Sequence, residues 1–175
     1  LAQFRFGWMF EDKRGVPQNY VKAAEWNEKA ALQGVAVAQS NLAGMYFSGR
    51  GVPQNDKKAF AWYKKAAEQG ISIAQYALAL LYLNGRGVQQ SDSKAAEWFE
   101  KAAEQGVADA QINLGLMYFN GKGVPQSDLK AAKWFERAAE QGLAVAQNNM
   151  GFLYLNGRGV PQNDKKAAEW YKKAA

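Results

Sequence analysis

The sequence predicts an all-α fold, a right-handed superhelical α/α solenoid of five 36-residue helix-turn-helix repeats. Three periodic features predict it. Gly-Val pairs and tryptophans recur at a constant spacing, and so do single glycines that would close each repeat. The members of the three series are Gly15, Gly51, Gly87, Gly123 and Gly159; Trp26, Trp62, Trp98, Trp134 and Trp170; and Gly34, Gly70, Gly106 and Gly142. A fixed period of this size is the signature of an array whose units stack on their neighbours.

The first helix of each repeat, helix A, is clearest in the second copy, between Val37 and Phe47. Its buried stripe is expected to contain Ala38, Leu42, Met45 and Tyr46, which have the spacing of one helical face. Helix A is expected to end at an Asn-Gly or Ser-Gly pair, because glycine and asparagine tolerate the left-handed conformation of a helix terminus. The following Val-Pro-Gln cannot continue the helix, because proline lacks an amide hydrogen.

The second helix, helix B, is expected to start near Asp56, with Asn55 as its N-cap. Ser91 and Ser127 take the same position in later copies. The buried stripe is expected to contain Ala59, Trp62, Tyr63 and Ala66, and truncating a well-buried Trp62 or Trp98 to alanine is expected to cost about 3–5 kcal/mol. A short link at Gly70 would then make helix B antiparallel to the next helix A.

Small residues share one position of helix A, namely Gly7, Ala43, Ala79, Gly115 and Gly151. They are expected to let a neighbouring helix approach closely while aromatic residues fill the remaining space. We treat residues 1–175 as one repeat domain with units 1–34, 35–70, 71–106, 107–142 and 143–175. The first and last units are expected to be partial, as in a piece of a longer chain.

Composition limits the possible chemistry. The chain has no cysteine and no histidine, so it lacks thiols and the commonest general base and metal ligand. No catalytic residue, metal site or cofactor is predicted, and no apolar run is long enough to span a membrane. The net charge of +6 could indicate nucleic acid or an anionic membrane. Lysines such as Lys57, Lys58, Lys64 and Lys65 instead recur among glutamates, which favours solvated helix faces and no nucleic-acid partner.

The fourth copy carries the elements of a known repeat: Ala110-Gln111, Leu114-Gly115-Leu116-Met117-Tyr118, Gly121-Lys122-Gly123-Val124, Lys130-Ala131, Trp134 and Arg137-Ala138-Ala139. This pattern resembles the Sel-one-like repeat family, relatives of the tetratricopeptide repeats, over the whole chain. The resemblance implies a non-enzymatic adaptor that binds proteins or peptides, and favours a bacterial periplasmic or secreted protein over a cytoplasmic one. Some bacterial members carry cysteine pairs, which this chain lacks. The first copy departs from the pattern at Lys13, Tyr20 and Asn27.

Positions of helix A that vary between copies are candidates for partner contacts. By the resemblance, helix A lines a concave wall, where aromatic and aliphatic side chains could hold an extended peptide and amides could bond its backbone. The predicted contact residues are Phe4, Trp8, Tyr76, Leu80, Ile112, Asn113, Leu116, Asn148, Asn149 and Phe152. The alternative is that these side chains only add packing between repeats.

Two further hypotheses remain open. Ser91-x-x-Lys94 and Ser127-x-x-Lys130 match a motif of penicillin-recognising enzymes, which would indicate activity on cell wall or β-lactams, although N-capping explains both serines. End-to-end self-association is the other, through Phe6, Met9 and Phe10 at one end and Trp170 and Tyr171 at the other. The recurring loop cations Arg50, Arg86, Lys122 and Arg158 could form a basic rim for acidic partners, or could satisfy helix A carbonyls.

Overall fold

The computed structural model describes residues 3, 9–10 and 18–175. Phe4, Phe6 and Trp8 lie outside the described residues. Within the described part, all regular structure is helical, and nine helices follow one another in pairs, which confirms the all-α repeat fold. The chain divides into two compact units, residues 1–90 and residues 91–175.

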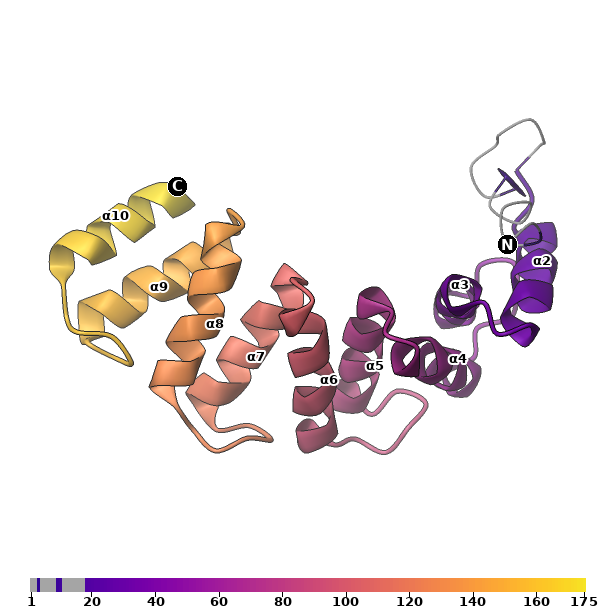
Figure 1. Cartoon of the computed structure of the whole chain (residues 1–175), viewed down its shortest axis with the longest axis horizontal. Coiled ribbons are helices and arrows are strands. Elements are labelled where there is room, and N and C mark those ends of the chain that lie inside the picture. Colours follow the sequence, from indigo (N-terminus) through magenta and orange to yellow (C-terminus); the bar gives the residue numbers. More distant parts are fainter. Residues whose placement is uncertain (1–2, 4–8, 11–17) are drawn as a thin grey trace. The chain divides into compact units, whose positions relative to one another are not determined.

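The helix bounds follow the repeat in both units (Figure 1). The first unit contains α2 (Tyr20–Leu32), α3 (Ala36–Ser48), α4 (Asp56–Glu68) and α5 (Ser72–Asn84). The second contains α6 (Asp92–Glu104), α7 (Ala108–Asn120), α8 (Asp128–Glu140), α9 (Ala144–Asn156) and α10 (Asp164–Ala174). Helix A of the repeat is thus α3, α5, α7 and α9, and helix B is α2, α4, α6, α8 and α10. Consecutive helices of each unit pack against one another.

Helix B begins, and helix A ends, at the residues that local chemistry predicts. The side chain of Asn55 accepts a hydrogen bond from the Lys58 amide at 2.9 Å, and Ser91 and Ser127 accept the equivalent bonds at 3.4 and 3.3 Å. Helix A ends on a left-handed glycine in every case, as at Gly49 with φ 70°. These contacts confirm the predicted caps and give Ser91 and Ser127 a structural role.

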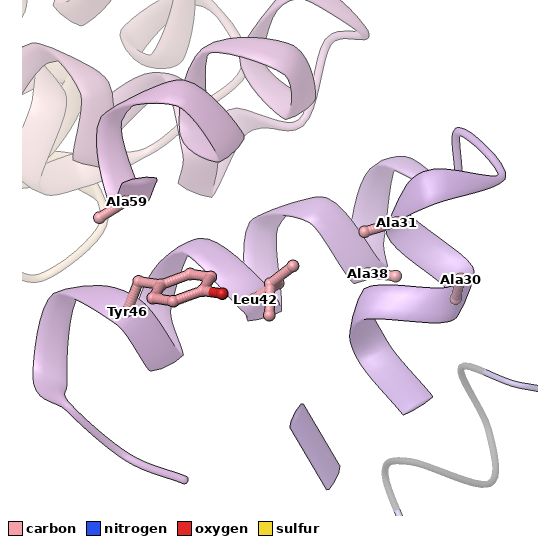
Figure 2. Packing of buried hydrophobic residues seen from close by; sticks show 6 residues of the cluster. All are labelled: Ala30, Ala31, Ala38, Leu42, Tyr46 and Ala59. Carbon is pink, nitrogen blue, oxygen red and sulfur yellow. The ribbon is translucent and has the colours of Figure 1, made fainter. Parts of the chain in front are cut away.

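The helix interfaces are built from alanines with a few larger side chains. One cluster joins Ala30 and Ala31 of α2, Ala38, Leu42 and Tyr46 of α3, and Ala59 of α4, as shown in Figure 2. The predicted stripe of helix A is confirmed, since all four of its members are buried. Small side chains at these contacts let the helix axes come close together, so that the larger residues fill the space between them.

The tryptophans are less buried than the sequence suggested. Trp62 and Trp98 are half-buried, and lysine ammonium groups lie 4.4 Å from their rings. The residue after the tryptophan packs deeper in two copies, where Phe99 and Phe135 are 0% and 2% exposed. The expected cost of truncating Trp62 or Trp98 was therefore too high, because part of each ring keeps its contact with solvent.

The small positions of helix A behave as predicted in the second unit. A Cβ atom on Gly115 would lie 2.6 Å from the Phe135 ring, and one on Gly151 would lie 2.7 Å from the Tyr171 ring. Both distances are well inside carbon–carbon contact. Glycine at these two positions therefore makes room for the aromatic side chain of the following helix B.

A buried glutamine at the start of helix A links three helices. The Gln111 side chain donates to the Ala103 carbonyl at the end of α6 at 3.1 Å. Its oxygen accepts from Gln141, which follows α8, at 2.9 Å. Gln39 makes the same two bonds in the first unit, to Ala31 and Gln69. This amide gives a carbonyl at the helix terminus a second donor, beside the backbone amide of Gly106 or Gly34.

Candidate partner-binding surface

The predicted contact residues lie at different depths on helix A. Leu116 and Phe152 are 39% and 43% exposed, and Asn148 is exposed. Tyr76, Leu80, Asn113 and Asn149 are half-buried. Ile112 is only 9% exposed, so its side chain is part of the packed interior and offers little surface. Phe4 and Trp8 lie outside the described residues.

A cavity in the first unit lies between α3 and α5. It has a volume of about 160 Å³ and is lined by Phe47, Tyr63, Ala77, Leu80, Leu81, Asn84 and Arg86. Leu80 is one of the predicted contact residues, at a helix A position that varies between copies. Tyr63 reaches the cavity from helix B. Apolar rings and aliphatic side chains form most of its wall, so the cavity suits an apolar side chain.

A cavity at the equivalent place in the second unit lies between α7 and α9. It has a volume of about 230 Å³ and is lined by Leu116, Phe119, Phe135, Asn149, Phe152 and Leu153. The Phe119 and Phe152 rings meet edge to face at a centroid distance of 6.0 Å. Here three predicted contact residues, Leu116, Asn149 and Phe152, come together around one hollow.

The two cavities are the same feature two repeats apart. Phe119, Phe135 and Leu153 occupy the repeat positions of Phe47, Tyr63 and Leu81. The positions that differ are Tyr63, Ala77 and Leu80 in the first unit, against Phe135, Asn149 and Phe152 in the second. The helix framework therefore repeats while these three wall residues change, so each cavity has its own shape and polarity.

Asn149 contributes an unusual polar group to the second cavity. Its Nδ2 atom is buried and has no hydrogen-bond acceptor among the described residues. A buried donor without an acceptor is costly, so such groups are rare in folded proteins. Asn113 differs, because its Nδ2 donates to the Asp109 carbonyl at 2.8 Å within its own helix. Asn149, unlike Asn113, therefore has an unused buried donor.

A more polar hollow adjoins Gly44. This glycine occupies the helix A position that Leu80 and Phe152 occupy in other copies, so no side chain fills the space there. Its volume is about 340 Å³, and its lining includes Ser40, Asn41, Gly44 and Tyr63. Burial raises the pKa of the Tyr63 phenol above its ordinary value of about 10. Tyr63 borders both this hollow and the apolar cavity of the first unit.

The loop cations do not form the free basic rim that the sequence suggested. Arg86 and Arg158 each make two hydrogen bonds of 2.8–3.0 Å to Asp56 and Asp128, which start the preceding helix B. The bonds to Asp128 raise the pKa of Arg158. Lys122 makes a looser ion pair with Asp92 at 3.5 Å. Arg50 has no such aspartate, and its guanidinium lies 5.1 Å from the Tyr20 ring.

The arginine pairs also support the cavities. The Arg86 guanidinium lies 4.1 Å from the centre of the Phe47 ring, and that of Arg158 lies 3.8 Å from the Phe119 ring. Each arginine thus joins a helix B aspartate to an aromatic wall of the helix A cavity. Their role is to hold the repeats and the cavity wall together, which corrects the expectation of a rim for acidic partners.

Comparison with known families identifies the repeat. The Sel1 repeat model matches five successive segments, residues 1–35, 36–71, 72–107, 108–143 and 144–175. The chain belongs to the Sel1 repeat family. Sel1 repeat proteins are generally protein-interaction scaffolds and typically non-enzymatic. No match was found among curated proteins.

Solved Sel1 structures have the same fold. A protective antigen present in uropathogenic Escherichia coli strains is 35% identical, with a TM-score of 0.96 over 99% of this chain and 37% of that one. A Sel1 repeat protein from Oxalobacter formigenes is also 35% identical, with a TM-score of 0.94, over 99% of this chain and 71% of that one. Cysteine-rich protein B of Helicobacter pylori is 30% identical, with a TM-score of 0.52, over 73% of this chain and 86% of that one. The chain thus spans about a third of the first relative's length.

Two structural elements are absent from the residues that the structure describes. Among the residues that the structure describes, no helix combines the length and apolar character needed to cross a membrane. The same residues hold no group of three or more acidic side chains arranged to bind a metal ion.

Proposed function

We propose that this Sel1 repeat chain is a non-catalytic scaffold that binds a partner protein or peptide through the exposed face of helix A. The recurrence of one apolar cavity between successive helix A segments carries the proposal. Leu80 borders the cavity of the first unit, and Leu116 and Phe152 border that of the second. Apolar pockets that repeat along a protein suit the anchor side chains of a bound segment.

The exposed apolar residues favour binding over simple packing. Leu116 and Phe152 are 39% and 43% exposed although each has a neighbouring cavity that it could fill more completely. Residues needed only for packing between repeats would be expected at low exposure, as found for Ile112. Tyr76, Asn113 and Asn148 extend the proposed surface beside the cavities.

Asn149 supplies the polar element of the proposed surface. Its buried Nδ2 lacks an acceptor at the wall of the second cavity. A carbonyl oxygen of a bound peptide could accept this hydrogen after a small rotation of the side chain. The contact would fix the direction of the peptide, while the apolar anchors would supply most of the affinity.

The test is to select binding peptides from a random library on the parent chain and to measure their affinities by calorimetry. The pocket variant combines Leu116→Ala with Phe152→Ala. The control variant combines Leu129→Ala with Val145→Ala, because those side chains are 57% and 60% exposed and line neither cavity. The proposal predicts at least about tenfold weaker binding to the pocket variant and nearly unchanged binding to the control. Equal affinities for the parent and a folded pocket variant would reject the helix A surface.

A further inference from the structure

A third cavity lies away from the helix A face, at the meeting of α6, α7 and α8. It has a volume of about 230 Å³ and is lined by Glu100, Tyr118, Lys130, Lys133, Trp134 and Arg137. It shares no residue with the two helix A cavities. Three cations, two aromatic rings and one carboxylate surround a space large enough for a small polar group.

Part of this arrangement is a regular feature of the repeat. The Lys130 ammonium lies 4.9 Å from the centre of the Tyr118 ring, and the Arg137 guanidinium lies 4.7 Å from the Trp134 ring. In the last repeat, Lys166 and Lys173 lie in the same way over Tyr154 and Trp170, at 5.1 and 4.1 Å. These pairs hold the cations in place, and because they recur they do not by themselves indicate a ligand.

Lys133 is the residue that departs from the repeat. The other copies have Glu25, Ala61, Glu97 and Glu169 at this position. On α10 the glutamate therefore lies on the same helix face as the two ring-bound cations, and on α6 it lies on the same face as Lys94 and Lys101, since residues three and four apart are neighbours. On α8 a third cation replaces it. The reversal turns a stripe of mixed charge into three adjacent positive groups.

No acidic side chain of the described residues forms an ion pair with Lys130, Lys133 or Arg137 within 4.0 Å. The loop cations of the same unit contrast with them, because Lys122 and Arg158 are both paired with aspartates. Like charges on adjacent helix positions repel each other. Four copies fold without a lysine at this position, so stacking of the repeats does not require Lys133.

The surroundings suit a single carboxylate better than a polyanion. Glu97 on α6 and Glu169 on α10 carry negative charge at the same repeat position of the neighbouring helix B segments. A nucleic-acid strand, with a phosphate on every nucleotide, would place charge near these glutamates as well. One carboxylate can instead accept hydrogen bonds from the guanidinium of Arg137 and the ammonium of Lys133. The Tyr118 and Trp134 rings can contact the apolar atoms beside that carboxylate.

We propose that the cavity around Lys133 binds a glutamate or aspartate side chain of an acidic segment in a partner protein. This second contact would lie on the helix B side of the scaffold. It rests on the charge reversal at Lys133 and on the lining of the cavity, and does not depend on the helix A surface.

The probe for the test is a fluorescein-labelled peptide, Gly-Ser-Glu-Glu-Phe-Glu-Gly, compared with its glutamine counterpart by fluorescence anisotropy. The parent chain is expected to bind the glutamate peptide at least about fivefold more tightly than the glutamine peptide. Lys133→Glu, which introduces the residue of the neighbouring copies, should weaken binding of the glutamate peptide by at least about fivefold. The control is Lys172→Glu, the same charge change on exposed α10 outside the cavity, and its effect should stay below about twofold.

A second variant tests for gain of binding. Glu169→Lys would place a third cation between Lys166 and Lys173, and it should raise the number of bound glutamate peptides from one to two. Equal losses in Lys133→Glu and Lys172→Glu would overturn the proposal, because net charge alone would then explain binding. Equal binding of the two peptides would also overturn it. Tighter binding of labelled oligothymidine, lost in Lys133→Glu, would assign the cavity to nucleic acid instead.

Discussion

Replacing Gly115 by alanine tests whether close packing against Phe135 limits the size of the side chain at this position of helix A. The added Cβ would lie 2.6 Å from Cε1 and 2.8 Å from Cδ1 of Phe135. Carbon atoms in contact prefer about 3.5–4.0 Å, so the ring would have to move by about 1 Å. Phe135 is only 2% exposed, which leaves it little free space in the interior.

The magnitude follows from two opposing effects. Overpacking a well-packed interior costs about 1–3 kcal/mol, whereas alanine is about 1 kcal/mol better than glycine inside a helix. Gly115→Ala should therefore reduce the free energy of unfolding by about 0–2 kcal/mol. Gly44→Ala is the matched control, because its Cβ would meet only the Tyr63 hydroxyl oxygen, at 3.3 Å, beside an open hollow. The same substitution should stabilise the first unit there by about 0.5–1 kcal/mol.

Urea denaturation followed by circular dichroism would measure both variants. Hydrogen exchange would then assign each change to its unit, because repeat proteins need not unfold in one step. Phe135→Leu in the Gly115→Ala background should recover part of the loss, since it removes ring atoms that clash. Stabilisation of both glycine variants by the same amount would refute the reasoning, because Phe135 would then move aside without cost. The displaced ring would also enter the helix A cavity, so Gly115→Ala should weaken peptides that bind there.

Three further predictions concern other parts of the chain. Gln111→Leu should reduce the free energy of unfolding by about 1–3 kcal/mol in chemical denaturation, because it removes two hydrogen bonds, one to the Ala103 carbonyl and one from the Gln141 side chain; an unchanged value would contradict this. The free energy of unfolding should fall as the pH rises from about 10 through the raised pKa of Tyr63, because the phenol ionises first in the unfolded chain. Thermal melts at about pH 8 and 10.5 should show a smaller fall for Tyr63→Phe than for the parent chain. Equal falls would count against this prediction. The chain should self-associate with increasing concentration in sedimentation velocity, through an apolar face that includes Tyr171, which is 37% exposed; monomer mass at the highest concentration would rule this out.

Features set by neighbouring residues could be predicted from the sequence. The caps at Asn55 and Ser91 and the glycine terminus at Gly49 depend on bonds within a few residues. The buried stripe of helix A follows from spacing alone, because the repeat allows one packing direction. The prediction that Phe10 belongs to an exposed end face was wrong, because Phe10 is only 8% exposed and packs against Ala23, Ala24 and Met45, which lie far from it in the sequence.

The arginine–aspartate pairs show why other features were missed. Arg86 and Asp56 are 30 residues apart and belong to successive copies, so no local pattern joins them. Each residue was interpreted separately, the aspartate as a favourable charge at a helix start and the arginine as a loop cation. A comparison between copies gives no signal either, because arginine is present both where the aspartate occurs and where Tyr20 replaces it, and only the structure shows Arg50 near the Tyr20 ring.

Some residues differ from their equivalents in other copies and have a contact in the fold that explains the difference. Others have no such contact. Tyr20 replaces the aspartate that starts helix B in the other copies and lies 5.1 Å from the Arg50 guanidinium, so this change has a partner in the fold. Lys133 and Asn149 have no such partner among the described residues: the first forms no ion pair, and the second leaves a buried donor unused. Stacking alone would favour the residues that the other copies carry at the position of Lys133, whereas Asn149 shares its position with Asn41 and Asn113 and differs from Asn113 in its unused donor. A bound carboxylate at Lys133 and a bound carbonyl at Asn149 would each supply the missing interaction, which is why both proposed contacts are placed at these residues.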